Sequence, residues 1–157
     1  IKLIRTYKLD QKSQILDVGC GKGYLLQEIK LLLPKIKIVG FDISKYAISN
    51  AHPNIKKKLF KYDAAKPFPF KRKKFDLVIS INTIHNLKIN DLKKSLEEIE
   101  RVGKKSFIAV ESFRNDLELF NLQCWALTCQ SFFSKTEWEW LFKEYKFRGD
   151  YEFIYFI

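Results

Sequence analysis

Short, continuously apolar segments alternate along the chain with longer segments in which apolar residues recur every three or four positions. A continuous apolar run bounded by polar residues is typical of a strand buried on both faces of a parallel sheet. "FDLVISI" at 75–81 is the clearest such run. The same pattern predicts further strands at 14–18, 36–41, about 58–62, 106–112 and 151–157.

The segments between these runs have the apolar spacing of amphipathic helices. The first, at 24–33, is expected to end at Pro34, because proline interrupts helical hydrogen bonding. Side chains that can accept a backbone hydrogen bond precede the other helices and predict where each begins. The predicted caps and helices are Ser44 before a helix to about Ala51, Asn90 before 91–102, Asn115 with Glu118 before 117–130, and Ser134 with Glu137 before a helix that contains Trp138, Leu141, Phe142 and Tyr145.

This order of elements favours an α/β fold with a doubly wound, Rossmann-like sheet. The alternation of strands and helices indicates about six mainly parallel strands with helices on both faces. A chain of 157 residues fits one domain, so we expect residues 1–157 to form a single unit. Ligands of such sheets bind at the carboxyl ends of the strands, which is where candidate site residues should be sought.

Composition agrees with a folded domain, since 46% of the residues are hydrophobic and 15% are aromatic. No apolar run approaches the roughly 18 residues of a membrane span, and "IKLIRTYKLD" lacks the apolar run of a signal peptide. Because the chain starts at Ile1 and contains no Met, we expect an N-terminal piece to be missing or removed. Cys20, Cys124 and Cys129 form no metal-ligand spacing, which predicts reduced thiols, a cytoplasmic location and no metal site.

The net charge of +11 is a weak indication of nucleic-acid binding. Only five of the 29 basic residues are arginine, whereas phosphate-binding proteins favour the planar fork of arginine. The lysines are spread along the chain, and the densest cluster, "KRKK" at 71–74, is expected to be a solvated loop.

"QILDVGCGKGYLL" at 14–26 is the clearest ligand-binding motif, because its three glycines stand between a predicted strand and a predicted helix. The dinucleotide fingerprint G-x-G-x-x-G would need its third glycine at position 24 if it began at Gly19, or at position 26 if it began at Gly21. Tyr24 and Leu26 occupy those positions, so the fingerprint is absent. No P-loop pattern occurs either. The carboxylate of Asp17 would repel a pyrophosphate, but it suits S-adenosylmethionine, whose amino group and sulfonium are cationic.

Two further carboxylates follow the next predicted strands. Asp42 closes "KIVGFD" 19 residues beyond Gly23, near the spacing at which a carboxylate accepts hydrogen bonds from ribose hydroxyls. Asp63, in "YDAAKPFPF", follows the third strand and could accept a hydrogen bond from an adenine amine. The glycine turn, Asp42 and Asp63 therefore agree in order, spacing and chemistry.

Over residues 13–112 the sequence resembles the class I S-adenosylmethionine-dependent methyltransferases, and most of all their small-molecule, type 11-like group. The four motifs that carry the resemblance are residues 14–23, "VGFDIS" at 39–44, "DAAKPFPF" at 63–70 and "FDLVISINTIHNL" at 75–87. The resemblance implies S-adenosylmethionine as cofactor. The cofactor-binding residues it implies are Asp17, Gly19, Cys20, Gly21, Gly23, Asp42, Ile43, Asp63, Ala64 and Asn82.

The chain departs from the family pattern at both ends. Members usually carry N-terminal helices that cover the cofactor, whereas here only "IKLIRTYKL" precedes the first strand, so the lid is short or missing. They usually close with a helix and an antiparallel hairpin, of which only "YEFIYFI" is present. The resemblance thus implies that the last strand runs antiparallel.

Methyl transfer is an in-line displacement, and a general base helps it only when the acceptor must lose a proton. His85, just past the fourth strand, and Glu111, at the end of the fifth, are the candidate catalytic residues. Asn86 could position an acceptor, and Arg114 could bind an acidic one. The alternatives are that His85 only packs near the cofactor and that the others are solvated residues at helix starts.

The leading hypothesis is methyl transfer to an oxygen, nitrogen or carbon of a small molecule such as a saccharide or a biosynthetic metabolite. A nucleic-acid methyltransferase is an alternative that rests on charge alone, since "NTIH" stands where base-methylating enzymes resemble "[DN]-P-P-[YF]". A cofactor-binding subunit without catalysis of its own is a third, and a nicotinamide dehydrogenase comes last. The sequence favours no particular oligomeric state or partner chain.

Overall fold

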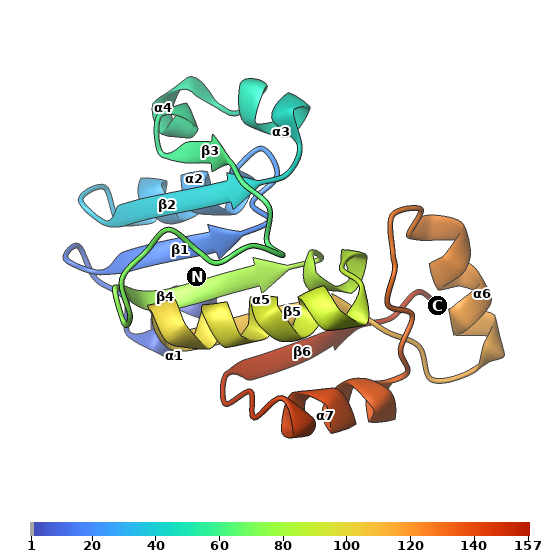
Figure 1. The fold of residues 1–157 in the computed structure, drawn as a ribbon. Coiled ribbons are helices and arrows are strands. Elements are labelled where there is room, and N and C mark those ends of the chain that lie inside the picture. The colour runs from blue at the N-terminus through green and yellow to red at the C-terminus, as the bar shows by residue number, and fades with distance from the viewer. Residues whose placement is uncertain (1) are drawn as a thin grey trace.

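The computed structural model describes residues 2–157, which form one six-stranded sheet with helices on both faces (Figure 1). The strand order is β3-β2-β1-β4-β5-β6, and every neighbouring pair is parallel. The chain therefore builds outward in one direction from β1 to β3 and in the other from β4 to β6, with the switch point between β1 and β4. The strands are β1 (Gln14–Val18), β2 (Lys37–Asp42), β3 (Leu59–Lys61), β4 (Phe75–Ile81), β5 (Gly103–Glu111) and β6 (Asp150–Ile154).

The helices connect successive strands and divide between the two faces. Residues of α1, α2 and α4 pack on one face, and residues of α5 and α7 pack on the other. None of the described helices is long and apolar enough to cross a membrane. The helices are α1 (Lys2–Tyr7), α2 (Tyr24–Leu32), α3 (Lys45–Ser49), α4 (Pro53–Lys56), the short 3₁₀ helix η1 (Ile84–Asn86), α5 (Ile89–Val102), α6 (Asp116–Trp125) and α7 (Lys135–Glu144).

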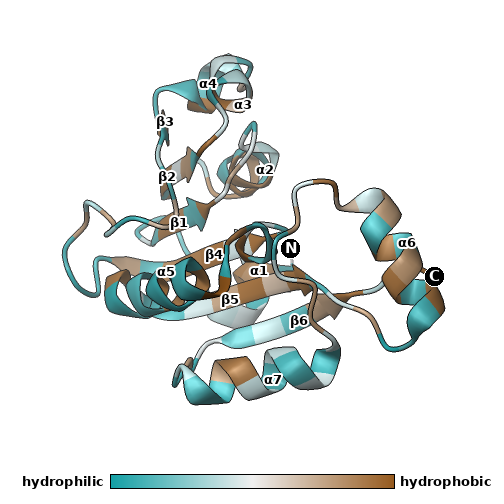
Figure 2. Ribbon diagram, turned by 45° about the vertical axis from the view of Figure 1, so that its right-hand side comes forward, coloured by the Kyte–Doolittle hydropathy of each residue, from teal (hydrophilic) through white to brown (hydrophobic). Residues whose placement is uncertain are grey.

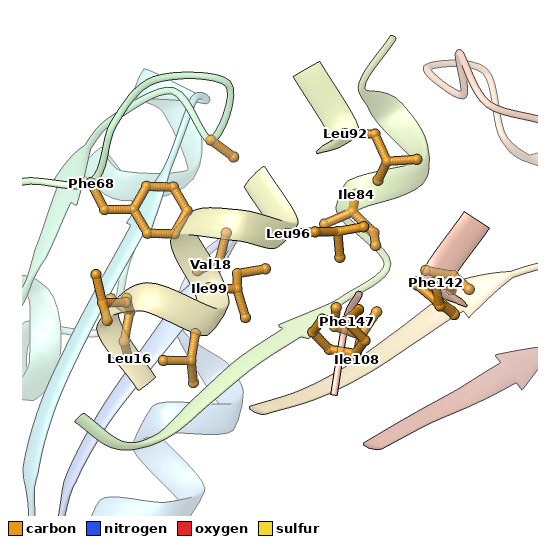
Figure 3. Packing of buried hydrophobic residues seen from close by; sticks show 14 of the residues in the cluster. Leu16, Val18, Phe68, Ile84, Leu92, Leu96, Ile99, Ile108, Phe142 and Phe147 are labelled. Carbon is orange, nitrogen blue, oxygen red and sulfur yellow. The ribbon is translucent and has the colours of Figure 1, made fainter. Parts of the chain in front are cut away.

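The core consists of two layers because side chains along each strand alternate between the faces. In β4, Leu77 and Ile79 point to the α2 side, whereas Val78 points to the α5 side. Figure 3 shows the second layer, in which Leu96 and Ile99 of α5 lie over strand residues. Figure 2 shows the matching hydrophilic residues on the exposed side of α5. Burial on both faces explains why the strands appear in the sequence as continuous apolar runs.

The predicted α/β fold with a parallel sheet is confirmed, but the antiparallel last strand is wrong. β6 pairs with β5 in parallel, from Phe107 opposite Asp150 to Glu111 opposite Ile154. The connection at 112–149 crosses from the carboxyl end of β5 through α6 and α7 back to its amino end, so the next strand starts in the same direction.

Two predicted helix boundaries are also wrong. α5 is capped by Lys88 rather than by Asn90, because the chain is extended at Lys88 and its carbonyl already accepts hydrogen bonds from Asp91 and Leu92. α6 ends at Trp125, five residues before the predicted end at Gln130, since the chain turns there and Gln130 N donates to the carbonyl of His85.

Three of the predicted caps are present. The side chains of Ser44, Asn115 and Ser134 each accept a hydrogen bond from the backbone N–H three residues later. Ser134 and Glu137 form the complete capping box. The carboxylate of Glu118 instead accepts from Arg114 N, so the box predicted with Asn115 is only half formed.

Candidate active site

The glycine-rich turn lies at the carboxyl end of β1, next to the switch point of the sheet. Its backbone is held to β2, because the N–H groups of Gly19 and Cys20 both donate to the carbonyl of Phe41, at 2.9 and 3.0 Å. Gly19 has φ +76°, and a Cβ there would lie 2.0 Å from Thr83 Oγ1. Gly21 has φ +53°, and a Cβ there would meet no atom within 4 Å. The turn therefore packs against Thr83 on one side and leaves open space at Gly21.

That open space belongs to a cleft of about 430 Å³ at the carboxyl ends of the strands. Its walls come from four loops, which follow β1, β2, β3 and β4, together with Thr128 beyond α6. The predicted cofactor residues that line it are Gly19, Gly21, Asp42, Ile43, Asp63, Ala64 and Asn82. Of the predicted acceptor-binding residues, Asn86 lines it as well.

Asp42 stands at the end of β2 with both carboxylate oxygens fixed. Oδ2 accepts from Gly21 N and Oδ1 accepts from Ser44 N, each at 2.8 Å. A carboxylate oxygen has a second lone pair, so each oxygen can still accept from a ligand hydroxyl. The two hydrogen bonds from the backbone thus orient the carboxylate at the cleft, and they leave it able to accept further hydrogen bonds from a ligand.

Asp63, which also lines the cleft, is fixed in a similar way. Its Oδ1 accepts from Ala65 N at 2.9 Å, which closes a tight turn after β3. The neighbouring Tyr62 lines the cleft, and its hydroxyl donates to the carbonyl of Pro67 at 2.6 Å. The loop that presents Asp63 and Ala64 is therefore held by its own hydrogen bonds.

Asp17 lies below the cleft floor, near the end of β1, and is only 4% exposed. Burial raises the pKa of its carboxyl from 3.8 to about 7, and the negative charge of Asp42 adds to the rise. None of the hydrogen bonds found among residues 2–157 involves its side-chain oxygens. A buried carboxylate without a partner is costly, which is why the pKa of this carboxyl is raised so far.

The other two predicted cofactor residues that do not line the cleft support it from behind. The Sγ of Cys20 lies 3.7 Å from the carbonyl of Gly21, and burial raises the pKa of this thiol well above its ordinary value. A thiol that stays protonated is a poor nucleophile, which fits a packing role. Gly23 occupies the N-cap position of α2.

His85 and Glu111 meet beside the cleft, where η1 follows β4 and β5 ends. His85 Nε2 and Glu111 Oε2 are 3.3 Å apart, and the two side chains are 4% and 5% exposed. Within the described part of the chain, neither His85 Nδ1 nor Glu111 Oε2 has a hydrogen-bond partner. Burial lowers the pKa of His85 to about 4 and raises the pKa of Glu111, so the imidazole is neutral around pH 7.

The segment 126–131 covers this pair. The N–H groups of Gln130 and Ser131 donate to the carbonyl of His85, each at 3.0 Å. Thr128 Oγ1 donates to Asn86 Oδ1 at 2.8 Å, which places both side chains at the same wall of the cleft. The pair is therefore buried by a loop from outside the four motifs.

Of the residues predicted for catalysis and acceptor binding, His85, Glu111 and Arg114 do not line the cleft, and Arg114 is the one that is exposed. Its guanidinium forms an ion pair with Glu118 and lies 4.3 Å from the ring centre of Tyr155. A binding role for Arg114 toward an acidic acceptor stays a prediction. Cleft-lining residues that the sequence did not indicate are Phe41, Tyr62, Thr83, Leu87 and Thr128. Phe41 and Tyr62 are the sequence neighbours of the predicted Asp42 and Asp63, whereas no feature of the sequence indicated Thr128.

Known proteins share sequence with much of this chain. Residues 9–146 match the family model of the methyltransferase domain. The chain is 31% identical over 109 residues to the mouse protein named arginine-hydroxylase NDUFAF5, mitochondrial, covering 69% of this chain and 31% of that protein. It is 27% identical over 150 residues to malonyl-[acyl-carrier protein] O-methyltransferase of Bacillus anthracis, covering 86% of this chain and 55% of that protein.

A solved structure shows the same fold. The YcgJ protein of Bacillus subtilis superposes with a TM-score of 0.73 at 19% identity, covering 92% of this chain and 65% of that one. The chain thus spans about a third to a half of the two curated relatives and two thirds of this solved chain.

Proposed function

The chain belongs to the class I S-adenosylmethionine-dependent methyltransferases, and on that premise we propose that it methylates a small, uncharged acceptor. The proposed reaction is an in-line displacement in which the protein aligns donor and acceptor across the cleft. S-adenosylmethionine supplies an electrophilic methyl group on a cationic sulfonium. The remaining steps depend on the residues of the chain itself.

The observation that carries this proposal is the acidity of the cleft in an otherwise basic protein. The chain has a net charge of +11, yet among the described residues that line the cleft there is no Lys or Arg. Asp42 and Asp63 line it, and Asp17 lies beneath it. A phosphate-bearing ligand would be repelled here, whereas a ligand with a cationic amino acid part and ribose hydroxyls suits these groups.

Each acid has a distinct role in this proposal. Asp17, buried without a partner, binds the cationic amino acid end of the donor and regains its charge in doing so. Asp42 accepts from the ribose hydroxyls with its two oriented oxygens. Asp63 accepts from the adenine amine, with Ile43 and Ala64 as the apolar surroundings of the ring. Gly21 leaves room for the ligand to approach the backbone.

On the acceptor side, His85 is the proposed proton acceptor and Glu111 its partner. A neutral imidazole can take a proton from a hydroxyl or an amine, and a carboxylate 3.3 Å away stabilises the imidazolium that results. Asn86 lies beside them on the cleft wall and can hold the acceptor by a hydrogen bond.

An anionic acceptor suits this arrangement poorly. Near the pair it would face Glu111, and Arg114 is engaged by Glu118. The Bacillus anthracis relative is named for a malonyl acceptor on an acyl carrier protein. We propose a different acceptor for this chain, an uncharged hydroxyl or an amine.

Calorimetric titration tests the donor half of the proposal. We expect S-adenosylmethionine and S-adenosylhomocysteine to bind and NAD not to bind. Asp42→Ala should weaken binding at least about tenfold, because it removes charge-assisted hydrogen bonds, whereas Asp116→Ala on α6 should not. Circular dichroism shows whether each variant is folded, and Asp63→Asn is the second variant should Asp42→Ala unfold. Failure of the folded wild type to bind either compound would refute the donor assignment.

Transfer of a radiolabelled methyl group tests the acceptor half. The panel sets phenol, catechol, glucose and a primary amine against benzoate and malonate. His85→Gln should keep donor binding but lower transfer by about 100-fold. Preferred methylation of the two carboxylates would contradict the proposed acceptor class. Donor binding without any transfer would favour the alternative of a cofactor-binding subunit.

A further inference from the structure

A second cleft, of about 490 Å³, lies at the opposite edge of the sheet. It is formed where β4, β5 and β6 begin, so it faces away from the cleft with the glycine turn. Its volume falls in the range of small-molecule sites. The residues around it come from three separate parts of the chain, at 72–73, 97–106 and 145–150.

The lining of this cleft has an excess of positive charge. Seven of its residues are Lys or Arg and three are Asp or Glu. The basic residues are Arg72, Lys73, Arg101, Lys104, Lys105, Lys146 and Arg148. A concave surface with charge of one sign concentrates the field and attracts counter-ions.

Three of these cations have structural partners. Lys73 Nζ donates to the carbonyls of Glu100 and Gly103, at 2.9 and 2.7 Å. Arg101 pairs with a carboxylate one turn earlier on α5, and Lys104 pairs with Asp76 at 2.8 Å. These contacts hold the segments that form the cleft in place.

The other four cations that line the cleft have no ion pair among residues 2–157, and one of them, Lys105, lies with its Nζ 6.0 Å from the ring centre of Tyr7. They are Arg72, Lys105, Lys146 and Arg148. The carboxylates of the lining leave an excess of positive charge, and a bound anion would relieve the repulsion that remains.

The acidic residues of the cleft offset only part of the positive charge, because there are three of them against seven cations, and two of the three also hold the walls together by hydrogen bonds. Glu100 Oε1 accepts from Ser106 Oγ at 3.0 Å and from Arg148 N at 3.4 Å. Asp150 accepts from the hydroxyl of Tyr7 at 2.6 Å. Glu100 thus holds the loop that carries Arg148 against β5.

The far rim is fixed by close packing as well. A Cβ on Gly149 would lie 2.2 Å from Ser106 Oγ and 2.8 Å from the carbonyl of Ser106. This close approach brings the loop before β6 onto β5, so that Lys146 and Arg148 line the same cleft as Lys105. The cations are therefore presented by ordered segments, whereas the sequence had suggested only a solvated loop at 71–74.

From this arrangement we propose that the second cleft binds a ligand with two or more linked phosphate groups. Arginine binds phosphate oxygens in pairs and lysine binds them as a point charge, so a lining with seven cations against three carboxylates suits a multiply charged anion. Pyrophosphate, a nucleoside triphosphate and an RNA backbone all present this chemistry. The site lies at the opposite edge of the sheet from the proposed donor cleft, so it is not the place where the methyl group is transferred.

Titration of the whole chain with pyrophosphate, ATP and a single-stranded RNA 12-mer tests the proposal. Arg72→Ala combined with Arg148→Ala removes one cation from each rim and should weaken binding about tenfold. Lys57→Ala combined with Lys58→Ala removes the same charge outside the cleft and should leave binding unchanged. Melting curves and binding of S-adenosylmethionine report that each double variant is folded.

The probes also distinguish the source of the phosphate. Binding of pyrophosphate and ATP that the arginine pair controls indicates a free polyphosphate, whereas RNA binding alone, with the same dependence, indicates a nucleic-acid backbone. In either case affinity should fall steeply with salt. Equal losses in both double variants would overturn the proposal, because they would indicate diffuse charge rather than a site. Absence of binding by all three probes would overturn it too.

Discussion

Replacing Asp17 by asparagine should stabilise the ligand-free domain and at the same time abolish donor binding. Asparagine has nearly the shape of the protonated acid but cannot ionise. The carboxyl of Asp17 is buried, and its pKa rises from 3.8 to about 7. One pKa unit corresponds to about 1.36 kcal/mol, so keeping this charge in the folded state costs about 4 kcal/mol above pH 7. That figure is an upper bound on the gain from Asp17→Asn.

The sign of the pH dependence follows from where protons are bound. Between pH 3.8 and about 7 the folded state keeps a proton that the unfolded state has released. Asp17 therefore lowers the stability of the wild type as pH rises through this window, with the full cost present above it. The free energy of unfolding of Asp17→Asn should exceed that of the wild type by little near pH 4, and the difference should grow by about 2 to 3 kcal/mol between pH 5 and pH 8.

Urea unfolding followed by tryptophan fluorescence measures this difference directly. Asp116→Asn, on an exposed position of α6, is the matched control for the loss of a carboxylate that is not buried. Adding S-adenosylmethionine should raise the stability of the wild type but not of Asp17→Asn. A difference between Asp17→Asn and the wild type that stays flat from pH 5 to pH 8 would refute the reasoning.

Two other predictions concern the turn and the base. Gly19→Ala should destabilise the domain by about 1 to 3 kcal/mol more than Gly21→Ala. Both glycines have positive φ, but only a Cβ at position 19 would collide with Thr83. Equal melting temperatures of the two variants would contradict this prediction. The ring resonances of His85, assigned by their loss in His85→Gln, should stay unchanged from pH 8 to pH 5 and titrate only near pH 4, since burial holds the imidazole neutral. A titration midpoint of the His85 ring above pH 6 would show that water reaches the His85–Glu111 pair.

The cleft beside the glycine turn could be located from the sequence because the information that places it is local. A buried parallel strand leaves a continuous apolar run, and the residue that ends it is by position a candidate ligand group. Asp42 and Asp63 were identified in this way, and both line the cleft. The turn at Gly19 and Gly21 was identified by spacing alone, and both glycines have positive φ.

Features that depend on long-range packing could not be predicted. The orientation of β6 depends on how the connection at 112–149 crosses the sheet, and the resemblance pointed to the wrong direction. Thr128 reaches the cleft only because α6 ends early and the chain turns back onto η1. The sequence gives no sign of that contact, since Thr128 and Asn86 are far apart in the chain.

The direction of the strands explains why the net charge was a poor guide to the ligand. In a sheet whose strands all run the same way, loops that follow strands gather at one edge and loops that precede strands gather at the other. The loops after β1, β2, β3 and β4 bring together carboxylates, whereas the segments before β4, β5 and β6 bring together lysines and arginines. A charge of +11 averages over these two edges and describes neither of them. Ligand chemistry in this domain is therefore decided by which end of a strand a charged residue adjoins, and the donor assignment rests on the acidic edge together with the family of the chain.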